Sequence, residues 1–162
     1  MATSVISAVF EVYNGIAAPA FGGTARPPIH LGEAAQTTTA GAQLRPDNGY
    51  IVMYDDSFVP VYDSSFGGTE GGSIRFEVYA IPLGSATAIS VDSIVAGLKF
   101  GGFAPGAKRG LDFATLPLEG YYSTVSVKRV KEQRSYAGFN RDGQRCHKCD
   151  LTYRVVLGLS AT

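Results

Sequence analysis

The chain has 162 residues, of which 45% are hydrophobic and 17% charged, and its formal net charge is zero. A chain of this length typically forms one domain that buries roughly 70% of its unfolded surface. No apolar run reaches the roughly 18 residues that span a bilayer, and no Lys or Arg precedes Arg26. We therefore expect neither a membrane protein nor a secretion signal.

The zero net charge conceals an uneven distribution along the chain. Residues 1–77 contain eight acidic and three basic residues, whereas residues 78–162 contain eleven basic and six acidic ones. Half of the 14 basic residues lie in residues 126–148, where Glu132 and Asp142 are the only acids. Such a bipolar chain is suited to contacts with copies of itself or with partners of opposite charge.

The first predicted element is an amphipathic helix over residues 3–17, because apolar residues recur at spacings of three and four from Val5 to Ile16. Thr3 or Ser4 is available as its N-cap, and we expect it to stop near Pro19. Residues 19–49 show no periodicity and are predicted to form a long loop. A loop of this length is uncommon in a compact domain and is usually functional or disordered.

Two strands follow, over residues 50–54 and 73–81, and we expect them to pair. The second strand alternates, with Ile74, Phe76, Val78 and Ala80 on one face and Arg75, Glu77 and Tyr79 on the other. Residues 55–72 are predicted to form a projecting loop with exposed aromatic side chains and a Gly-rich hinge at its end. Ser85 is expected to cap a second helix, whose apolar face is Ile89 or Val91, then Ile94, Val95 and Leu98.

The last predicted unit is a charged C-terminal hairpin over residues 121–159, preceded by an irregular stretch at residues 103–120. Its first arm is predicted over about residues 121–136 and its second over about residues 145–159. Turn residues occupy positions 140–143, and apolar residues at every second position from 151 to 159 place the second arm on a core. The order of elements predicts one α+β domain spanning residues 1–162. It contains an antiparallel (mixed) sheet of about four strands, two helices on one face, and long irregular loops.

Cys146 and Cys149, the only cysteines, flank His147 and Lys148 in a pattern that invites a metal or redox interpretation. Zinc needs four ligands, and the only other histidine is His30 in the long loop. A redox cysteine pair normally opens a helix, whereas this pair lies where a strand begins. Residues three apart in a strand point to opposite faces, so we interpret both as unpaired strand cysteines, with no metal and no cofactor.

Other catalytic or ligand-binding patterns are incomplete. The glycine run at residues 67–72 lacks the ending and the following helix of a phosphate-binding loop. The acidic cluster of Asp55, Asp56 and Asp63 lacks the glycine spacing and the bidentate Glu of a calcium loop, so we interpret it as a solvated loop. No hydrolase or zinc-protease motif occurs, and two histidines leave little for acid–base catalysis, so we do not expect an enzyme.

The basic cluster has two interpretations. Residues 126–148 can form a small nucleic-acid-binding module with salt-dependent, sequence-independent affinity, in which Tyr136 and Phe139 stack on bases. Alternatively, the hairpin contacts a protein partner, or is solvated and uses its charges to prevent edge-to-edge aggregation. The neutral overall charge favours the second interpretation.

The whole layout resembles the tail terminator (minor tail) proteins of long-tailed bacteriophages and the related tail-completion proteins of phage-like particles. The resemblance is one of pattern and order, over nearly the whole chain. The features that carry it are the N-terminal helix, the extended stretch reaching residues 50–54, the strand at residues 72–80 with the helix at 86–98 directly after it, and the charged hairpin ending at residues 150–157.

The resemblance implies a structural virion protein at the head–tail junction, assembled in the host cytoplasm. Such a protein forms a ring, usually a hexamer, on the end of the tail tube and terminates its polymerisation. It also joins the tail to the head-completion (stopper) proteins. Genomic DNA passes through the centre without sequence-specific binding. The implied partners are therefore copies of itself, the tail tube protein, the stopper protein and DNA, with no membrane.

A head-to-tail ring needs two different patches that bind each other on neighbouring subunits. We predict one patch in the acidic loop and the other in the basic hairpin, since each carries charge of one sign on connections with little core-forming pattern. The predicted contact residues are Asp55, Asp56, Phe58, Tyr62 and Asp63 in the loop, and Lys128, Lys131, Arg134, Arg141 and Arg145 in the hairpin.

Overall fold

The computed structural model describes residues 4–23, 25–32, 49–55, 59–60, 69–80, 90–118, 122–139 and 145–159. The elements in these ranges are, in chain order, α1 (Val5–Gly15), η1 (Ala18–Phe21), β1 (Ile29–Leu31), β2 (Tyr50–Asp55), β3 (Val59–Pro60), β4 (Thr69–Ala80), α2 (Val91–Phe100), β5 (Tyr122–Phe139) and β6 (Arg145–Leu159).

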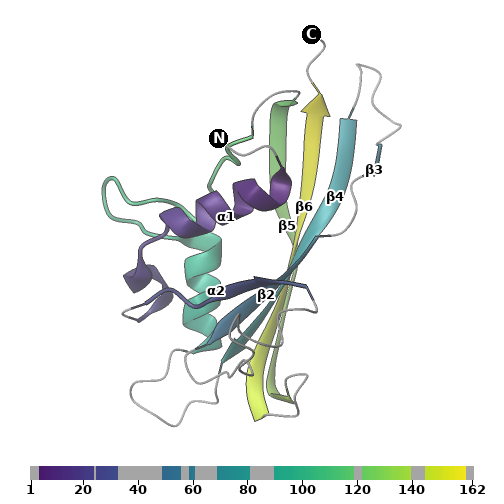
Figure 1. The fold of residues 1–162 in the computed structure, drawn as a ribbon. Helices are drawn as coiled ribbons and strands as arrows, with labels where there is room; N and C mark the ends of the chain where they lie inside the picture. The colour runs from purple at the N-terminus through teal and green to yellow at the C-terminus, as the bar shows by residue number, and fades with distance from the viewer. Residues whose placement is uncertain are drawn as a thin grey trace.

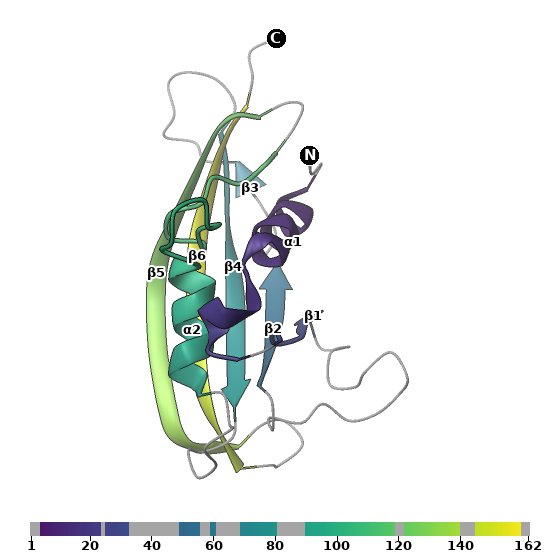
Figure 2. The same cartoon turned by 90° about the vertical axis from the view of Figure 1, so that its left-hand side faces the viewer.

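The strands form one sheet in the order β1-β2-β4-β6-β5, with β3 paired to β4. β1 runs parallel to β2, and the other pairs are antiparallel. Both α-helices lie on the same face of this sheet (Figure 1). Seen from the helix side, α2 lies beside β5 and α1 lies nearer to β2 (Figure 2). The predicted α+β class is confirmed, and β1 and β3 are short strands added to the expected four.

Each helix begins at a serine cap and buries its predicted apolar face. The Ser4 side chain accepts a hydrogen bond from the Ser7 amide at 3.2 Å, and Ser90 accepts one from Ser93 at 3.1 Å. The prediction that Ser85 caps the second helix is therefore wrong. Ser90 offers the same side-chain oxygen directly before the buried residues of α2 begin. These buried apolar residues are Val91, Ile94, Val95 and Leu98, as expected.

The two segments predicted as long loops contain regular structure. Residues 19–49 include most of η1 and all of β1, while residues 55–72 include the end of β2, all of β3 and the beginning of β4. Gly71 and Gly72, predicted to belong to a hinge, pair with Val156 and Val155 of β6. Ladder hydrogen bonds to β6 thus outweigh the weak strand preference of glycine. Residues 33–48, 56–58 and 61–68 lie outside the described residues.

The two faces of the sheet bury different side chains. Ile74, Phe76 and Val78 of β4 belong to the main core beneath the helices, which confirms the predicted alternation. On the helix-free face, meaning the face covered by neither α1 nor α2, a smaller cluster comprises Tyr50, Val52, Tyr79 and Cys146. The rings of Tyr50 and Tyr79 stack there, with centroids 4.9 Å apart.

A bulge in β5 decides which hairpin side chains face the helices. The β5–β6 register shifts between Arg129 and Lys131, so that Val130 has no directly paired residue in β6. Before the bulge, odd-numbered residues face the helices, and Val127 packs against the main core. After it, even-numbered residues do until the next register shift beyond Ser135, and Glu132 pairs with Lys99 of α2. A bulge changes the alternation of side chains in this way because it adds one residue to one strand only.

Candidate interaction surfaces

Most residues of the predicted basic patch lie in the described ranges, whereas Asp55 is the one residue of the predicted acidic patch that does. Four predicted contact residues lie within the hairpin strands, and Asp55 is the last residue of β2. The four are Lys128, Lys131 and Arg134 of β5 and Arg145 of β6. The predicted residues that lie outside the described ranges are Asp56, Phe58, Tyr62, Asp63 and Arg141.

On the helix side, the charges of the hairpin are neutralised within the subunit. The Glu132 carboxylate lies 2.9 Å from Lys99 of α2, 3.1 Å from Arg134 and 3.6 Å from Arg129. Arg129 also lies 3.4 Å from Asp112. Burial by itself raises the pKa of Glu132, but the hydrogen bond from Lys99 and the surrounding cations outweigh it and lower the pKa. This network joins β5 to α2 and to the segment after it.

Arg134 makes a second contact with α2. Its Nε donates a hydrogen bond to the Asp92 carboxylate at 2.6 Å, and the Tyr136 hydroxyl donates to the same carboxylate at 3.1 Å. Asp92 lies in the first turn of α2, where the helix dipole favours negative charge. Arg134 therefore already has carboxylate partners within the subunit, and its role in an intersubunit contact stays a prediction.

Four exposed cations lie together on the helix-free face, and we call this group the cationic face. They are Arg75 of β4, Lys128 and Lys131 of β5, and Arg154 of β6. Lys128 pairs directly with Arg154, and Thr152 pairs with both Arg75 and Lys131. Like charges directly opposite in a sheet are destabilising. In the described part of the chain, Lys128, Lys131 and Arg154 make no ion pair, so the subunit leaves this repulsion uncompensated.

Next to the cationic face, Lys148 of β6 is paired with the buried carboxylate of Glu77 in β4. Lys148 lies 2.8 Å from Glu77 and 3.3 Å from Asp150, and the Tyr79 hydroxyl donates to Glu77 at 2.5 Å. Burial raises the pKa of Glu77, but the hydrogen bonds from Lys148 and Tyr79 outweigh it and lower the pKa to about 2. A cavity of about 230 Å³ separates this network from Lys131. Lys148 is thus neutralised, unlike Lys128, Lys131 and Arg154 of the cationic face.

The two cysteines point to opposite faces of β6, as predicted. Cys149 belongs to the main core and Cys146 to the smaller cluster on the helix-free face. Both are free and fully buried. Burial raises the pKa of both thiols, that of Cys149 to about 11. These surroundings are those of inert packing residues, because nucleophilic cysteines are exposed and have a lowered pKa.

An exposed aromatic patch, which the sequence analysis did not identify, lies at the end of α2. We define it as Phe100, Phe103, Arg109 and Phe113. The ring centroid of Phe100 lies 6.1 Å from those of both Phe103 and Phe113, and the Arg109 guanidinium lies 4.9 Å from the Phe103 ring. Phe103 is 66% exposed and Phe113 61%. Exposed aromatics beside arginine are typical of the residues that dominate protein–protein interfaces.

Residues 101–113 follow α2 and carry most of this patch, and we call them the segment. Backbone hydrogen bonds hold this segment in place. Gly102 and Lys108 are joined by a bond of 3.0 Å, and the amides of Leu111 and Asp112 donate to the last turn of α2 at 2.9 Å. A Cβ at Gly110 would lie 2.5 Å from the Lys99 carbonyl carbon, so the segment touches the helix backbone where only glycine fits. The patch is therefore preorganised, which lowers the entropy cost of binding.

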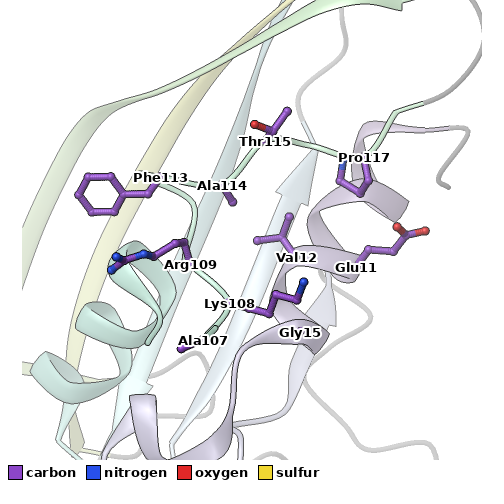
Figure 3. Close-up of a pocket in the computed structure, with 10 residues that line it drawn as sticks. All are labelled: Glu11, Val12, Gly15, Ala107, Lys108, Arg109, Phe113, Ala114, Thr115 and Pro117. Carbon is purple, nitrogen blue, oxygen red and sulfur yellow. The ribbon is translucent and has the colours of Figure 1, made fainter. Parts of the chain in front are cut away.

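A groove of about 410 Å³ lies on the other side of the same segment, against α1. Val12 of α1 and Lys108 lie between the helix and the segment, whereas Arg109 and Phe113 project away from α1 (Figure 3). Lys108 and Arg109 are both exposed, and neither makes an ion pair in the described ranges. The segment thus presents two exposed cations on opposite sides, Arg109 within the aromatic patch and Lys108 toward α1.

Within the described residues, no group of three or more His, Cys, Asp and Glu side chains is arranged to hold a metal ion. No helix in those ranges is long and apolar enough to cross a bilayer. Comparisons with models of known protein families and with curated proteins found no match for this chain.

Proposed function

We propose that this chain is a structural subunit of a phage-like particle. Copies of it form a ring on the end of a tail tube, with six subunits as in the tail terminators it resembles. The ring stops tube polymerisation, joins the tail to the stopper protein, and lets DNA pass through its centre. The order of elements, helix, paired strands, helix and hairpin, is the one on which the resemblance depends.

The observation that carries this proposal is the segregation of unneutralised charge on the hairpin. Arg129 and Arg134 are paired inside the subunit, whereas Lys128, Lys131 and Arg154 lie exposed on the helix-free face. A subunit around a DNA channel needs cations on one face and a protein-binding patch elsewhere. The cationic face supplies the first, and the aromatic patch on the helix side supplies the second. DNA attraction through phosphates alone is independent of sequence, which suits a channel.

Native mass spectrometry at up to tens of micromolar, combined with electron microscopy of tail tubes assembled in the presence of the chain, tests this proposal. We expect closed rings, and tubes that stop growing with a ring at one end. A chain that stays monomeric and also fails to bind tube ends contradicts the proposal. Binding to tube ends is the more important result, because a ring can form only after contact with the tube.

The second candidate function is a nucleic-acid-binding module that acts without a ring, and the same cationic face favours it. Fluorescence anisotropy with duplex DNA tests it at salt concentrations of about 50 to 200 mM. Lys128→Ala, Lys131→Ala and Arg154→Ala together should reduce the slope of log K against log salt by about three. Lys108→Ala with Arg109→Ala is the control for loss of charge elsewhere. Undetectable affinity at the lowest salt concentration rejects this candidate.

A further inference from the structure

The acidic, aromatic stretch at residues 55–70 needs a binding surface of matching chemistry. It contains four carboxylates, three aromatic side chains and no cation. The basic hairpin is a poorer match, since Arg129 and Arg134 are already neutralised. Among the described side chains its exposed aromatic, Tyr136, is bonded to Asp92 on the helix side, away from the cationic face. The aromatic patch offers exposed rings together with Arg109, whose guanidinium lies 4.9 Å from the Phe103 ring and makes no ion pair in the described ranges.

The geometry points to the aromatic patch as the surface on which a second copy of this chain docks its 55–70 stretch. This inference rests on the proposed ring and names the contact that would close it. Phe103 and Phe113 bury against the incoming aromatic side chains, and Arg109 meets its carboxylates. The cationic face is then left for the phosphate backbone of DNA. Patch and stretch differ in composition, so the contact is head-to-tail, which is the kind that builds rings.

Two features of the patch support binding over simple exposure. Exposed hydrophobic residues scattered singly on a surface need no explanation, but here two highly exposed rings flank a third. The segment that presents them is fixed by hydrogen bonds to α2, so the rings are held ready for a partner. Charge complementarity then selects the partner, because the 55–70 stretch carries the opposite charge at nearly every ionisable position.

Two full-length variants test the inference. The patch variant carries Phe103→Ser, Arg109→Glu and Phe113→Ser, and the stretch variant carries Asp56→Lys, Tyr62→Ser and Asp63→Lys. Each variant retains one intact half of the contact. We expect each alone to be monomeric under conditions where the unchanged chain forms rings. An equimolar mixture should form a one-to-one dimer and nothing larger, since only one complementary contact remains. Native mass spectrometry measures all three samples.

Leu31→Ser is the matched control, because Leu31 is an exposed apolar residue (47%) far from the patch in the sheet order. It should assemble like the unchanged chain. Circular dichroism and thermal unfolding of every variant verify folding, and substitutions at such exposed positions should leave both nearly unchanged. A patch variant that is unfolded is replaced by Arg109→Glu alone, which is expected to weaken assembly in the same direction.

The outcomes separate this inference from the proposed function. Rings that persist in the folded patch variant overturn the inference and leave the ring function intact. Two monomeric variants whose mixture forms no dimer also overturn it. The intact patch of one variant then does not bind the intact stretch of the other, so the stretch acts within its own chain. The mixture can also pair as expected while the unchanged chain never closes into rings or binds tube ends. That result supports the contact and overturns the proposed ring. A chain without any self-association or tube binding overturns both.

Discussion

The two faces of the β5–β6 hairpin hold their cations in different ways. On the helix side, Arg129 and Arg134 lie close to carboxylates of Asp112, Glu132 and Asp92. On the helix-free face, Lys128 and Arg154 lie directly opposite each other, and neither makes an ion pair in the described ranges. A count of charges along a chain therefore overstates the charge available to a partner. Only the assignment of each residue to a face shows which cations remain for binding.

The largest expected effect comes from adjacent residues of β6 that point to opposite faces. Leu151 is fully buried in the main core, so Leu151→Ala should lower the free energy of unfolding by about 2–5 kcal/mol through lost contacts and a cavity. Thr152 lies on the helix-free face, and Thr152→Ala should change the free energy of unfolding by less than about 0.5 kcal/mol. Urea denaturation at neutral pH measures both. Equal effects would show that the assignment of faces in β6 is wrong.

The neighbouring pair Glu132 and Gln133 of β5 tests the same distinction after the bulge. Glu132→Ala leaves Lys99, which is 8% exposed, without its carboxylate, and should cost about 1–3 kcal/mol of unfolding free energy. Gln133 is exposed on the helix-free face, so Gln133→Ala should be nearly neutral. Chemical denaturation of both variants checks the prediction. A neutral Glu132→Ala would mean that the helix-side network does not stabilise the fold.

The buried carboxylate of the helix-free face should make stability depend on pH. The pKa of Glu77 falls from 4.5 to about 2 on folding, so the folded state binds this proton less readily than the unfolded state. Its contribution, about 2 kcal/mol, is fully present above pH 4.5 and is lost as the pH falls toward 2. Glu77→Gln should lower stability at neutral pH and flatten this decline. Denaturation curves recorded between neutral and acidic pH measure the free energy of unfolding of both chains. An equally steep decline of this free energy in the variant would contradict the assigned role of Glu77.

The smallest expected effect concerns the cysteines, one on each face. Cys146→Ser with Cys149→Ser should cost no more than about 1–2 kcal/mol of unfolding free energy and should leave ring assembly intact. In the unchanged chain, both thiols should react slowly with a thiol reagent at neutral pH, because burial raises their pKa. Reaction kinetics and native mass spectrometry measure these effects. Stoichiometric zinc in the purified protein would contradict the interpretation of both cysteines as packing residues.

Part of this fold follows from short-range pattern. The predicted bounds of the second hairpin arm match β6, the predicted alternation of β4 is observed, and the helix faces contain the expected residues. The prediction failed where local composition favoured a loop, as at Gly71 and Gly72, because pairing with β6 is a contact between segments far apart in the chain. It also placed the second helix cap at Ser85, since several serines precede that helix and only the packed structure selects Ser90.

The candidate surfaces divide in the same way. Lys128 and Lys131 were identified from the density of basic residues, but Arg75 and Arg154 join them only through strand pairing. The aromatic patch was missed because Phe103 and Phe113 are ten positions apart in a segment without periodicity. They flank Phe100 because the backbone after residue 110 bonds to the last turn of α2.

The sequence by itself determined the α+β class, the helical and alternating faces, and the opposite placement of Cys146 and Cys149. These properties depend on the repeat of the local backbone, which is 3.6 residues in a helix and two in a strand. Only the tertiary structure decided which cations remain exposed. Unbroken alternation would place Arg129 and Lys131 on one face, and the bulge at Val130 separates them. The physical reason is that the register with β6 sets the position of the bulge, and register depends on the partner strand.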